Sequence, residues 1–151
     1  MPTPPSLPFG YKLHEGTLPS VPEYRHLRAA SGLKPMTEAQ SAAVPNGTWF
    51  GCHITYESAA VAMGRIISDG GWYFVISDMA VLPEHQRKGL GDAILKHLLV
   101  YIKDNAPEGE PYVTLTADPP GRKLYERNGF VESAPLNEVG MMLLDGWRDK
   151  L

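Results

Sequence analysis

The chain has 151 residues, of which 43% are hydrophobic and 21% are charged, and its formal net charge at pH 7 is -3. This length matches one domain with a core of its own, and the composition is that of a soluble globular protein. The small net charge argues neither for a surface that binds nucleic acid nor for one that docks on a membrane, since both need clustered Lys and Arg. We therefore predict a single domain over residues 1–151, with no nucleic-acid partner and no membrane partner.

The cysteine content and the first residues bear on where in the cell the protein is expected. The single cysteine, Cys52, excludes an internal disulfide and a multi-cysteine zinc site. No apolar run approaches the roughly 20 residues that span a bilayer. Residues 1–10 contain four prolines and no basic residue, and we expect them to form a flexible tail. The sequence predicts a cytoplasmic protein without a metal, and it leaves a nuclear location open.

The first half of the chain predicts an antiparallel meander. Thr37 with Gln40 three positions later is typical of a capping pair that opens a helix. Asp69-Gly70-Gly71 is typical of a hairpin turn. Strands are expected at residues 11–15, 49–57, 61–68 and 72–82, and helices at residues 22–30 and after Thr37.

The second half predicts a long helix that packs on this sheet. Apolar residues follow helical spacing over 89–105, and a helix this apolar must bury a face. Further elements are expected as a strand at 112–116, a helix at 121–127 and a closing strand pair near 130–132 and 139–144. The order predicts an α/β fold with a mixed, mostly antiparallel central sheet of six to seven strands and helices on both faces.

The stretch QRKGLG, residues 86–91, lies between the predicted strand and the long helix. A Walker phosphate loop is excluded because Leu90, and not a lysine with a hydroxyl residue, follows Gly89. A dinucleotide-binding turn is excluded because Ile94 stands where the third glycine is needed. Two glycines still let backbone N–H groups approach an anion at the positive end of the helix dipole. The turn predicts a phosphate or pyrophosphate site, and a purely structural turn is the alternative.

Two segments resemble the GNAT superfamily of N-acetyltransferases. Residues 86–91 resemble its acyl-coenzyme A signature, Q/R-x-x-G-x-G/A, and LYERNGF at 124–130 resembles its L-Y-x-x-x-G-F segment. The resemblance covers residues 61–144 and is only architectural before them. It implies a GNAT-like sheet with a splayed strand pair, acetyl-coenzyme A as co-substrate, and transfer of the acetyl group to an amine by direct attack through a tetrahedral intermediate.

The resemblance also implies which residues hold the coenzyme. The pyrophosphate would be bound by the backbone of Gln86, Arg87, Lys88, Gly89, Leu90, Gly91 and Asp92, and the pantetheine arm by the strand end Met79, Ala80 and Val81. Asp118 stands where many relatives carry an asparagine that contacts the pantetheine. The carboxylate of Asp92 suits the helix dipole, but it suits a pyrophosphate only if it points outward.

Acetylation of an amine requires a proton donor for the leaving thiolate and a proton acceptor for the amine. The resemblance places Tyr125 beside the thioester sulfur, where a phenol with a reference pKa near 10 would protonate the leaving thiolate. Asp78, or Ser77 holding a water, is the candidate acceptor of the amine proton, and a structural hydrogen bond from Asp78 is the open alternative. Regular strand alternation would put Asp78 on the face of Phe74 and Ile76. A backbone N–H near Met79 is the candidate donor to the oxyanion.

The acceptor remains the least constrained part of the prediction. Its pocket is expected to use Tyr24, Arg28, Trp49, Trp72 and Tyr73, with core packing of the aromatic rings as the alternative. No long acidic groove for a basic peptide is visible, which favours a small-molecule primary amine. A protein lysine or N-terminal acetyltransferase and a non-catalytic acyl-coenzyme A sensor are the alternative functions, and a homodimer is left open.

Overall fold

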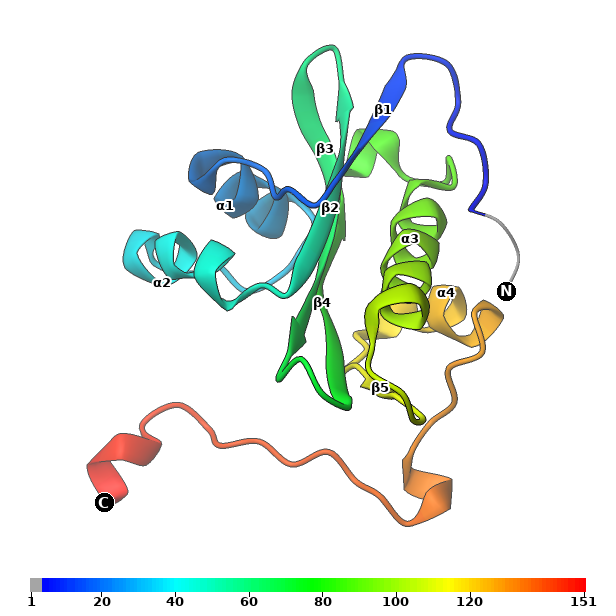
Figure 1. The fold of residues 1–151 in the computed structure, drawn as a ribbon. Coiled ribbons are helices and arrows are strands. Elements are labelled where there is room, and N and C mark those ends of the chain that lie inside the picture. Colours follow the sequence, from blue (N-terminus) through cyan, green and yellow to red (C-terminus); the bar gives the residue numbers. More distant parts are fainter. Residues whose placement is uncertain (1–3) are drawn as a thin grey trace. The chain divides into compact units, whose positions relative to one another are not determined.

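The computed structural model describes residues 4–151, which form two compact units. The first unit ends at Leu115, and the second runs from Thr116 to Leu151. The predicted tail falls partly on residues 1–3, outside the described residues, and residues 4–10 contain no helix or strand. The first unit holds the whole sheet and three α-helices, and the second holds the short helix α4 (Arg122–Arg127) (Figure 1).

The sheet has five strands in the order β1-β2-β3-β4-β5 among the described residues. Their bounds are β1 (Tyr11–Glu15), β2 (Phe50–Tyr56), β3 (Ala59–Ser68), β4 (Tyr73–Val81) and β5 (Tyr112–Thr114). The first four strands pair antiparallel, and β5 pairs parallel to β4. The prediction of a mixed, mostly antiparallel sheet is confirmed, whereas the prediction of six to seven strands is wrong.

The missing strands are those expected at 130–132 and 139–144. The second unit contains α4 and short 3-10 turns, and no strand is present in its residues. Val139, Met141, Met142 and Leu144 are 71%, 94%, 81% and 76% exposed. These segments are rich in apolar residues, but a strand also needs a neighbouring strand with which to pair. Apolar residues alone do not provide that partner.

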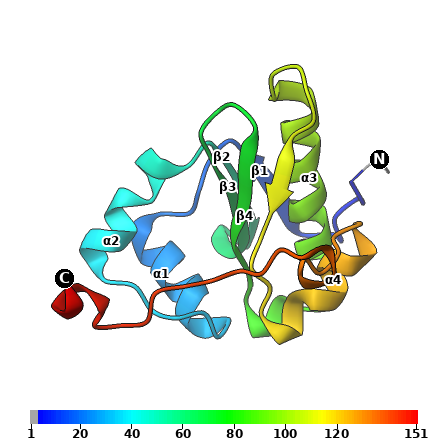
Figure 2. The same cartoon turned by 90° about the horizontal axis from the view of Figure 1, so that it is seen from below.

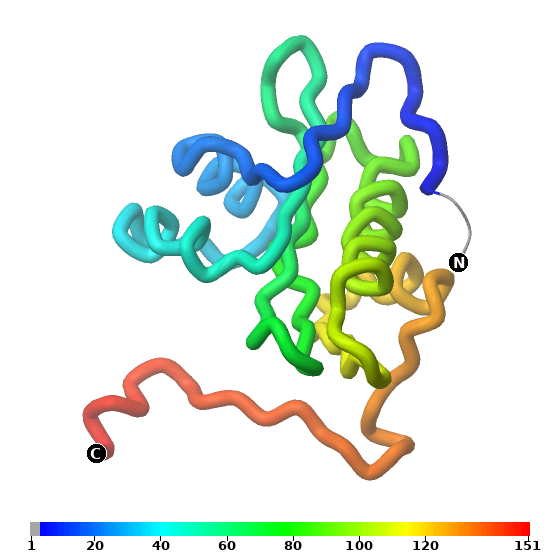
Figure 3. Tube along the Cα trace, viewed as in Figure 1, coloured from blue at the N-terminus to red at the C-terminus, as the bar shows by residue number. Residues whose placement is uncertain are grey.

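Turn chemistry sets the meander of the first unit. Glu57 and Ser58, between β2 and β3, both have positive φ angles, as two-residue hairpin loops require. The predicted turn between β3 and β4 is held by Asp69, whose carboxylate accepts hydrogen bonds from the N–H groups of Gly71 and Tyr73 at 2.8 and 3.3 Å. These bonds lower the pKa of the Asp69 carboxyl. Figure 3 shows the two turns at opposite ends of the sheet.

Helices cover both faces of the sheet (Figures 1 and 2), as predicted. On one face lie α1 (Val21–Ala30) and α2 (Glu38–Ala43), and on the other lies α3 (Leu90–Asn105). Ser20 caps α1 through its side-chain oxygen. Thr37 and Gln40 form the reciprocal capping box of α2, which confirms the predicted capping pair.

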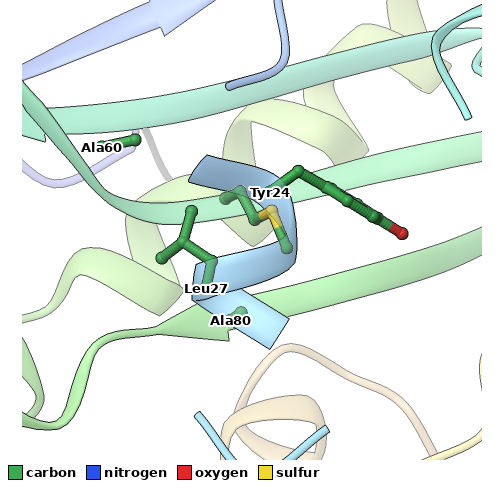
Figure 4. Close-up of a cluster of buried hydrophobic side chains, with 5 residues drawn as sticks. Tyr24, Leu27, Ala60 and Ala80 are labelled. Atoms are coloured by element: carbon green, nitrogen blue, oxygen red, sulfur yellow. The ribbon is translucent and has the colours of Figure 1, made fainter. Parts of the chain in front are cut away.

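Each face has its own core. Under α1, a buried cluster joins that helix to β3 and β4 (Figure 4), and its members are Tyr24, Leu27, Ala60, Met63 and Ala80. On the opposite side α3 buries Leu90, Ala93, Ile94, Leu95, Leu98, Leu99 and Ile102. Complete burial of a leucine or isoleucine side chain stabilises a fold by about 1.5–3 kcal/mol. The apolar residues of α3 therefore hold this helix against its face of the sheet.

Candidate active site

Strand β4 departs from regular pairing in its second half. Ser77 pairs with Arg65 and Ala80 pairs with Met63, so Asp78 and Met79 together stand opposite Gly64. Asp78 has a φ angle of 56°, in the left-handed region. Two residues facing one, with one of them in this conformation, define a β-bulge, which re-aims the side chains that follow it.

The bulge reverses the expected direction of the Asp78 side chain. Asp78 accepts a hydrogen bond from the Tyr24 hydroxyl at 2.8 Å, so its carboxylate lies on the α1 face of the sheet. Phe74 packs against Trp49, which in turn packs against Tyr101 of α3. The expectation that Asp78 shares a face with Phe74 is therefore wrong, because the extra residue of the bulge shifts the alternation by one position.

The carboxylate of Asp78 is surrounded by donors. Arg28 Nη1 bonds to Oδ1 and Arg65 Nε bonds to Oδ2 at 2.5 Å, in addition to the Tyr24 hydroxyl. Burial, followed by the hydrogen bond to Asp78, raises the pKa of Tyr24 to about 12. Both carboxylate oxygens of Asp78 are hydrogen-bonded to cationic or phenolic donors. These contacts favour a structural role of Asp78 over the role of a free proton acceptor. Ser77, one residue earlier, is half-buried.

Gly64 makes the bulge compatible with the packing of α3. A Cβ atom at Gly64 would lie 2.5 Å from Met79 Sδ and 2.6 Å from Ile94 Cγ2. Sequence reasoning missed both Gly64 and its neighbour Arg65. The available signal was an isolated glycine inside a strand pattern, which indicates a bulge or a close approach of two elements.

Strands β4 and β5 separate after a short paired stretch. Their register runs from Tyr73 opposite Tyr112 to Val75 opposite Thr114, and β4 then continues alone to Val81. Among the described residues, no β5 partner faces this last part of β4. The end of this pairing is what a splayed strand pair would require, and Met79, Ala80 and Val81 lie in the part of β4 beyond the last residue paired with β5.

The turn after β4 leads into a helix that has no side-chain cap. Arg87 and Gly89 have φ angles of 61° and 80°, and α3 begins at Leu90 with no side-chain cap, unlike α1 and α2. The N–H groups of the first helical residues have no partner within the helix. Residues 86–89 are exposed, and a Cβ atom on Gly89 would meet no atom within 4 Å. A helix N-terminus with this backbone can hold a phosphate group.

The side chains around the turn leave this space accessible. Asp92 pairs with Lys96 at 2.6 Å, one helical turn further on, so its carboxylate is directed along the helix. Gln86 Nε2 donates to the carbonyl oxygen of Val81 at 3.1 Å and ties the turn to the end of β4. His85 bonds to the Tyr11 hydroxyl at 2.7 Å, which links the turn to β1.

Tyr125 and Asp118 lie in the second unit. The ring of Tyr125, on α4, packs edge-on against Phe130 with centroids 5.9 Å apart. Burial, followed by the charge of Asp118, raises the pKa of the Tyr125 hydroxyl. The phenol therefore stays protonated at neutral pH, as a proton donor must. Asp118 precedes the 3-10 turn Pro119–Gly121 and accepts a hydrogen bond from the Gly121 N–H at its carbonyl oxygen.

The five residues predicted to bind the acceptor fall into three places. Tyr24 and Arg28 meet at Asp78. Trp49 packs in the α3 core, so its ring contacts favour the core-packing alternative. Trp72 and Tyr73 form an exposed aromatic group with ring centroids 5.4 Å apart. The structure thus brings only the first two together with a predicted catalytic residue.

The chain is similar to acetyltransferases in both sequence and structure. A family model described as an acetyltransferase (GNAT) domain matches residues 46–132. A protein of unknown function from meticillin-resistant Staphylococcus aureus, described as a probable acetyltransferase, is 33% identical with a TM-score of 0.82, and the match covers 89% of this chain and 98% of that one. No curated protein matches.

More distant structures share the fold. A GNAT-family acetyltransferase from Streptococcus pneumoniae is 20% identical with a TM-score of 0.75, and the match covers 90% of this chain and 98% of that one. The ribosomal-protein-S18-alanine N-acetyltransferase of Escherichia coli is 21% identical with a TM-score of 0.66, covering 81% and 78%. The family model and the Staphylococcus aureus structure thus identify an acyl-transfer enzyme, and this chain belongs to the GNAT acetyltransferase family.

Within residues 4–151, no group of three or more His, Cys, Asp or Glu side chains is placed to hold a metal ion. No helix in the same range is both long enough and apolar enough to cross a membrane.

Proposed function

We propose that this chain transfers the acetyl group of acetyl-coenzyme A to the primary amine of a small molecule. The observation that carries the proposal is the continuity of two features, the open edge of β4 after Val75 and the uncapped turn at the start of α3. A pantetheine arm can add to an open strand edge as an extended peptide does. The diphosphate would then reach the N–H groups of residues 86–92, with Arg87 and Lys88 adding positive charge.

Residues of the chain would supply the rest of the chemistry. Bound acetyl-coenzyme A supplies an activated acetyl thioester. The Met79 N–H at the bulge would donate to the acetyl oxygen as negative charge develops there. Tyr125 would give its proton to the departing thiolate, and Asp118 would lie along the pantetheine arm. The amine must lose a proton, because an alkylammonium is neutral on the order of one part in a thousand at pH 7. Ser77, through a bound water, would pass that proton to solvent.

Asp78 has a different part in this proposal. Its carboxylate would hold Arg28, Arg65 and Tyr24 around the bulge, so that the backbone of Met79 keeps its direction. A non-glycine residue in the left-handed region costs about 1–2 kcal/mol, and three hydrogen bonds offset that cost. Asp78 is therefore a positioning residue for the oxyanion donor.

Two other functions share the same coenzyme site. An acetyltransferase for a protein N-terminus or lysine differs in its acceptor, and the Escherichia coli neighbour, by its name, acts on an alanine of a ribosomal protein. A sensor would bind the coenzyme without turnover. An acceptor panel of small amines, amino acids and short peptides, with free thiol measured in the presence of acetyl-coenzyme A, separates the three. Amine-dependent thiol release supports the proposal, release with peptides alone supports a protein acceptor, and tight coenzyme binding without release indicates a sensor.

Replacement of Tyr125 by phenylalanine tests the proton donor. We expect Tyr125→Phe to lower kcat at least tenfold, because general acid catalysis contributes about 10²–10⁴-fold. The dissociation constant of coenzyme A, measured by calorimetry, should change little. Tyr101→Phe is the matched control, since it removes the hydroxyl of a tyrosine that packs against Trp49 and Phe50 in the α3 core. Equal turnover of the wild type and Tyr125→Phe would remove Tyr125 from this role.

A further inference from the structure

The cluster around Asp78 carries an excess positive charge. Arg28 and Arg65 contribute two cations and Asp78 one anion, while Tyr24, with its pKa raised to about 12, is neutral at pH 7. The side chains of Arg28, Arg65 and Asp78 are only 12%, 11% and 4% exposed. A mostly buried charge is costly unless an opposite charge balances it. The cluster is one negative charge short of balance.

The hydrogen bonds of the two arginines show where that charge can bind. A guanidinium has five N–H groups. Arg28 uses all three of its nitrogen atoms, bonding to Asp78 and to the carbonyl oxygen of Lys34. Arg65 uses Nε on Asp78 and Nη1 on Thr48 Oγ1, at 2.5 and 3.2 Å. Its Nη2 has no acceptor among the described residues.

The side chain of Arg65 is partly accessible, since 11% of it is exposed. Its Nη2 is not among the fully buried side-chain atoms of residues 4–151 that lack a partner. Arg65 is the cross-strand partner of Ser77 and stands next to the bulge. Paired residues of neighbouring strands are about 5 Å apart. Arg65 Nε also bonds to Asp78, whose neighbour Met79 is the proposed oxyanion donor, so an anion on Arg65 would lie near the bulge.

We propose that Arg65, oriented by Asp78, binds a carboxylate of the acceptor, and that the acceptor is an amine that also carries a carboxylate. The inference rests on the proposed acetyl transfer and names the class of its acceptor. A single negative charge restores balance, and a carboxylate carries one, whereas a phosphate monoester carries about 1.5 to 2. The planar guanidinium also matches the two oxygens of a carboxylate.

Matched acceptors test the proposal. L-Alanine carries a carboxylate where ethylamine has a hydrogen atom, and 4-aminobutanoate carries one where butylamine has a methyl group. The quantity measured is the ratio of kcat/KM within each pair, from thiol release with acetyl-coenzyme A. We expect the wild type to prefer the carboxylate in at least one pair and Arg65→Gln to lower that ratio about tenfold or more, as for a lost hydrogen bond to a charged group. Comparing the same pair between variants cancels the different basicities of the two amines.

Two further variants separate the loss of the carboxylate site from a general loss of structure. Arg25→Gln removes an exposed arginine of α1 and should leave the ratio unchanged. Arg65→Lys keeps the positive charge but not the planar fork, and its ratio should fall between those of the wild type and Arg65→Gln. If Arg65→Gln shows no cooperative thermal unfolding, it is not folded, and the ratio of kcat/KM is then compared between the wild type and Arg65→Lys. An equal ratio in the wild type and in a folded Arg65 variant, or no preference in the wild type, overturns the proposal.

Failure of the acetyl transfer itself has a different signature. If no amine releases thiol, the proposed function fails, and the carboxylate site is then tested by calorimetric titration of 4-aminobutanoate and of butylamine into the coenzyme A-loaded protein. Binding of 4-aminobutanoate that is at least tenfold tighter than that of butylamine, and that Arg65→Gln removes, supports the site. Equal binding of the two compounds overturns it.

Discussion

Asp78 adopts a backbone conformation that a non-glycine residue rarely takes, and three donors stabilise it there. Its φ angle of 56° places it at the bulge, while Tyr24, Arg28 and Arg65 converge on its carboxylate. Strain of this kind persists only where the surroundings over-determine it. Its occurrence next to the predicted oxyanion donor, Met79, connects the local backbone to the chemistry proposed for this strand.

Asp78→Asn tests the structural part of this view. The amide keeps the size of the side chain but leaves Arg28 and Arg65 without their counter-charge, and breaking a buried ion pair costs about 3–5 kcal/mol. We expect the free energy of unfolding, measured by urea denaturation, to fall by that amount. Asp104→Asn, at an exposed position of α3, is the control and should stay within about 0.5 kcal/mol of the wild type. Lost turnover with unchanged stability would instead indicate a proton acceptor.

Gly64 is the second residue on which the bulge depends. Gly64→Ala would force a Cβ atom to within 2.6 Å of Met79 and Ile94, and overpacking of this kind costs about 1–3 kcal/mol. We expect a lower midpoint of urea denaturation together with reduced kcat, because the bulge and the Met79 backbone must shift. Gly47→Ala is the matched control, since its Cβ would meet no atom within 4 Å. A Gly64→Ala protein as stable and active as the wild type would show that the bulge tolerates the shift.

At the scale of elements, the junction from β4 through the turn to α3 could be predicted from sequence and the bulge could not. Glycine spacing, the basic pair and the apolar helix are local patterns, and the structure has an uncapped helix with a left-handed Gly89 where they indicated one. The register around Asp78 depends on which residues of β3 face it, which a single strand does not encode. Arg65 was missed for the same reason, because its partners come from β4 and from the segment before β2.

A comparison of two glycines tests the phosphate turn. Gly89 and Gly32 have φ angles of 80° and 89°, and a Cβ atom on either would meet no atom within 4 Å. Gly89→Val and Gly32→Val should therefore cost similar stability through backbone strain, about 1–2 kcal/mol. The dissociation constant of coenzyme A, measured by calorimetry, should rise at least tenfold in Gly89→Val and stay unchanged in Gly32→Val, because only Gly89 lies where the diphosphate would approach. Equal affinity in the two variants would reject the phosphate turn.

At the scale of the whole molecule, the sequence predicted the first unit better than the second. The meander and α3 follow from turn residues and hydrophobic period, and both are local signals. The closing strand pair expected near 130–132 and 139–144 is absent, and those residues of the structure contain no strand. The prediction of one domain over 1–151 can be tested by asking whether the chain unfolds in a single cooperative transition. Cys52, in the first unit, can report that unfolding through its reactivity.

Cys52 is the single thiol of the chain and is fully buried in β2. Burial, followed by the charge of Glu15, raises its pKa to about 12, so that at pH 8 roughly one thiol in ten thousand is ionised. Because the thiolate is the reactive form, we expect a disulfide-exchange reagent to label the native protein very slowly and the urea-unfolded protein rapidly. If the chain unfolds as one domain, the urea midpoint for labelling will coincide with that for loss of far-UV circular dichroism.

Cys52→Ser, which should give no labelling at any urea concentration, is the control. Separate midpoints would show that the two units unfold independently, and rapid labelling without urea would show that the sheet opens under native conditions.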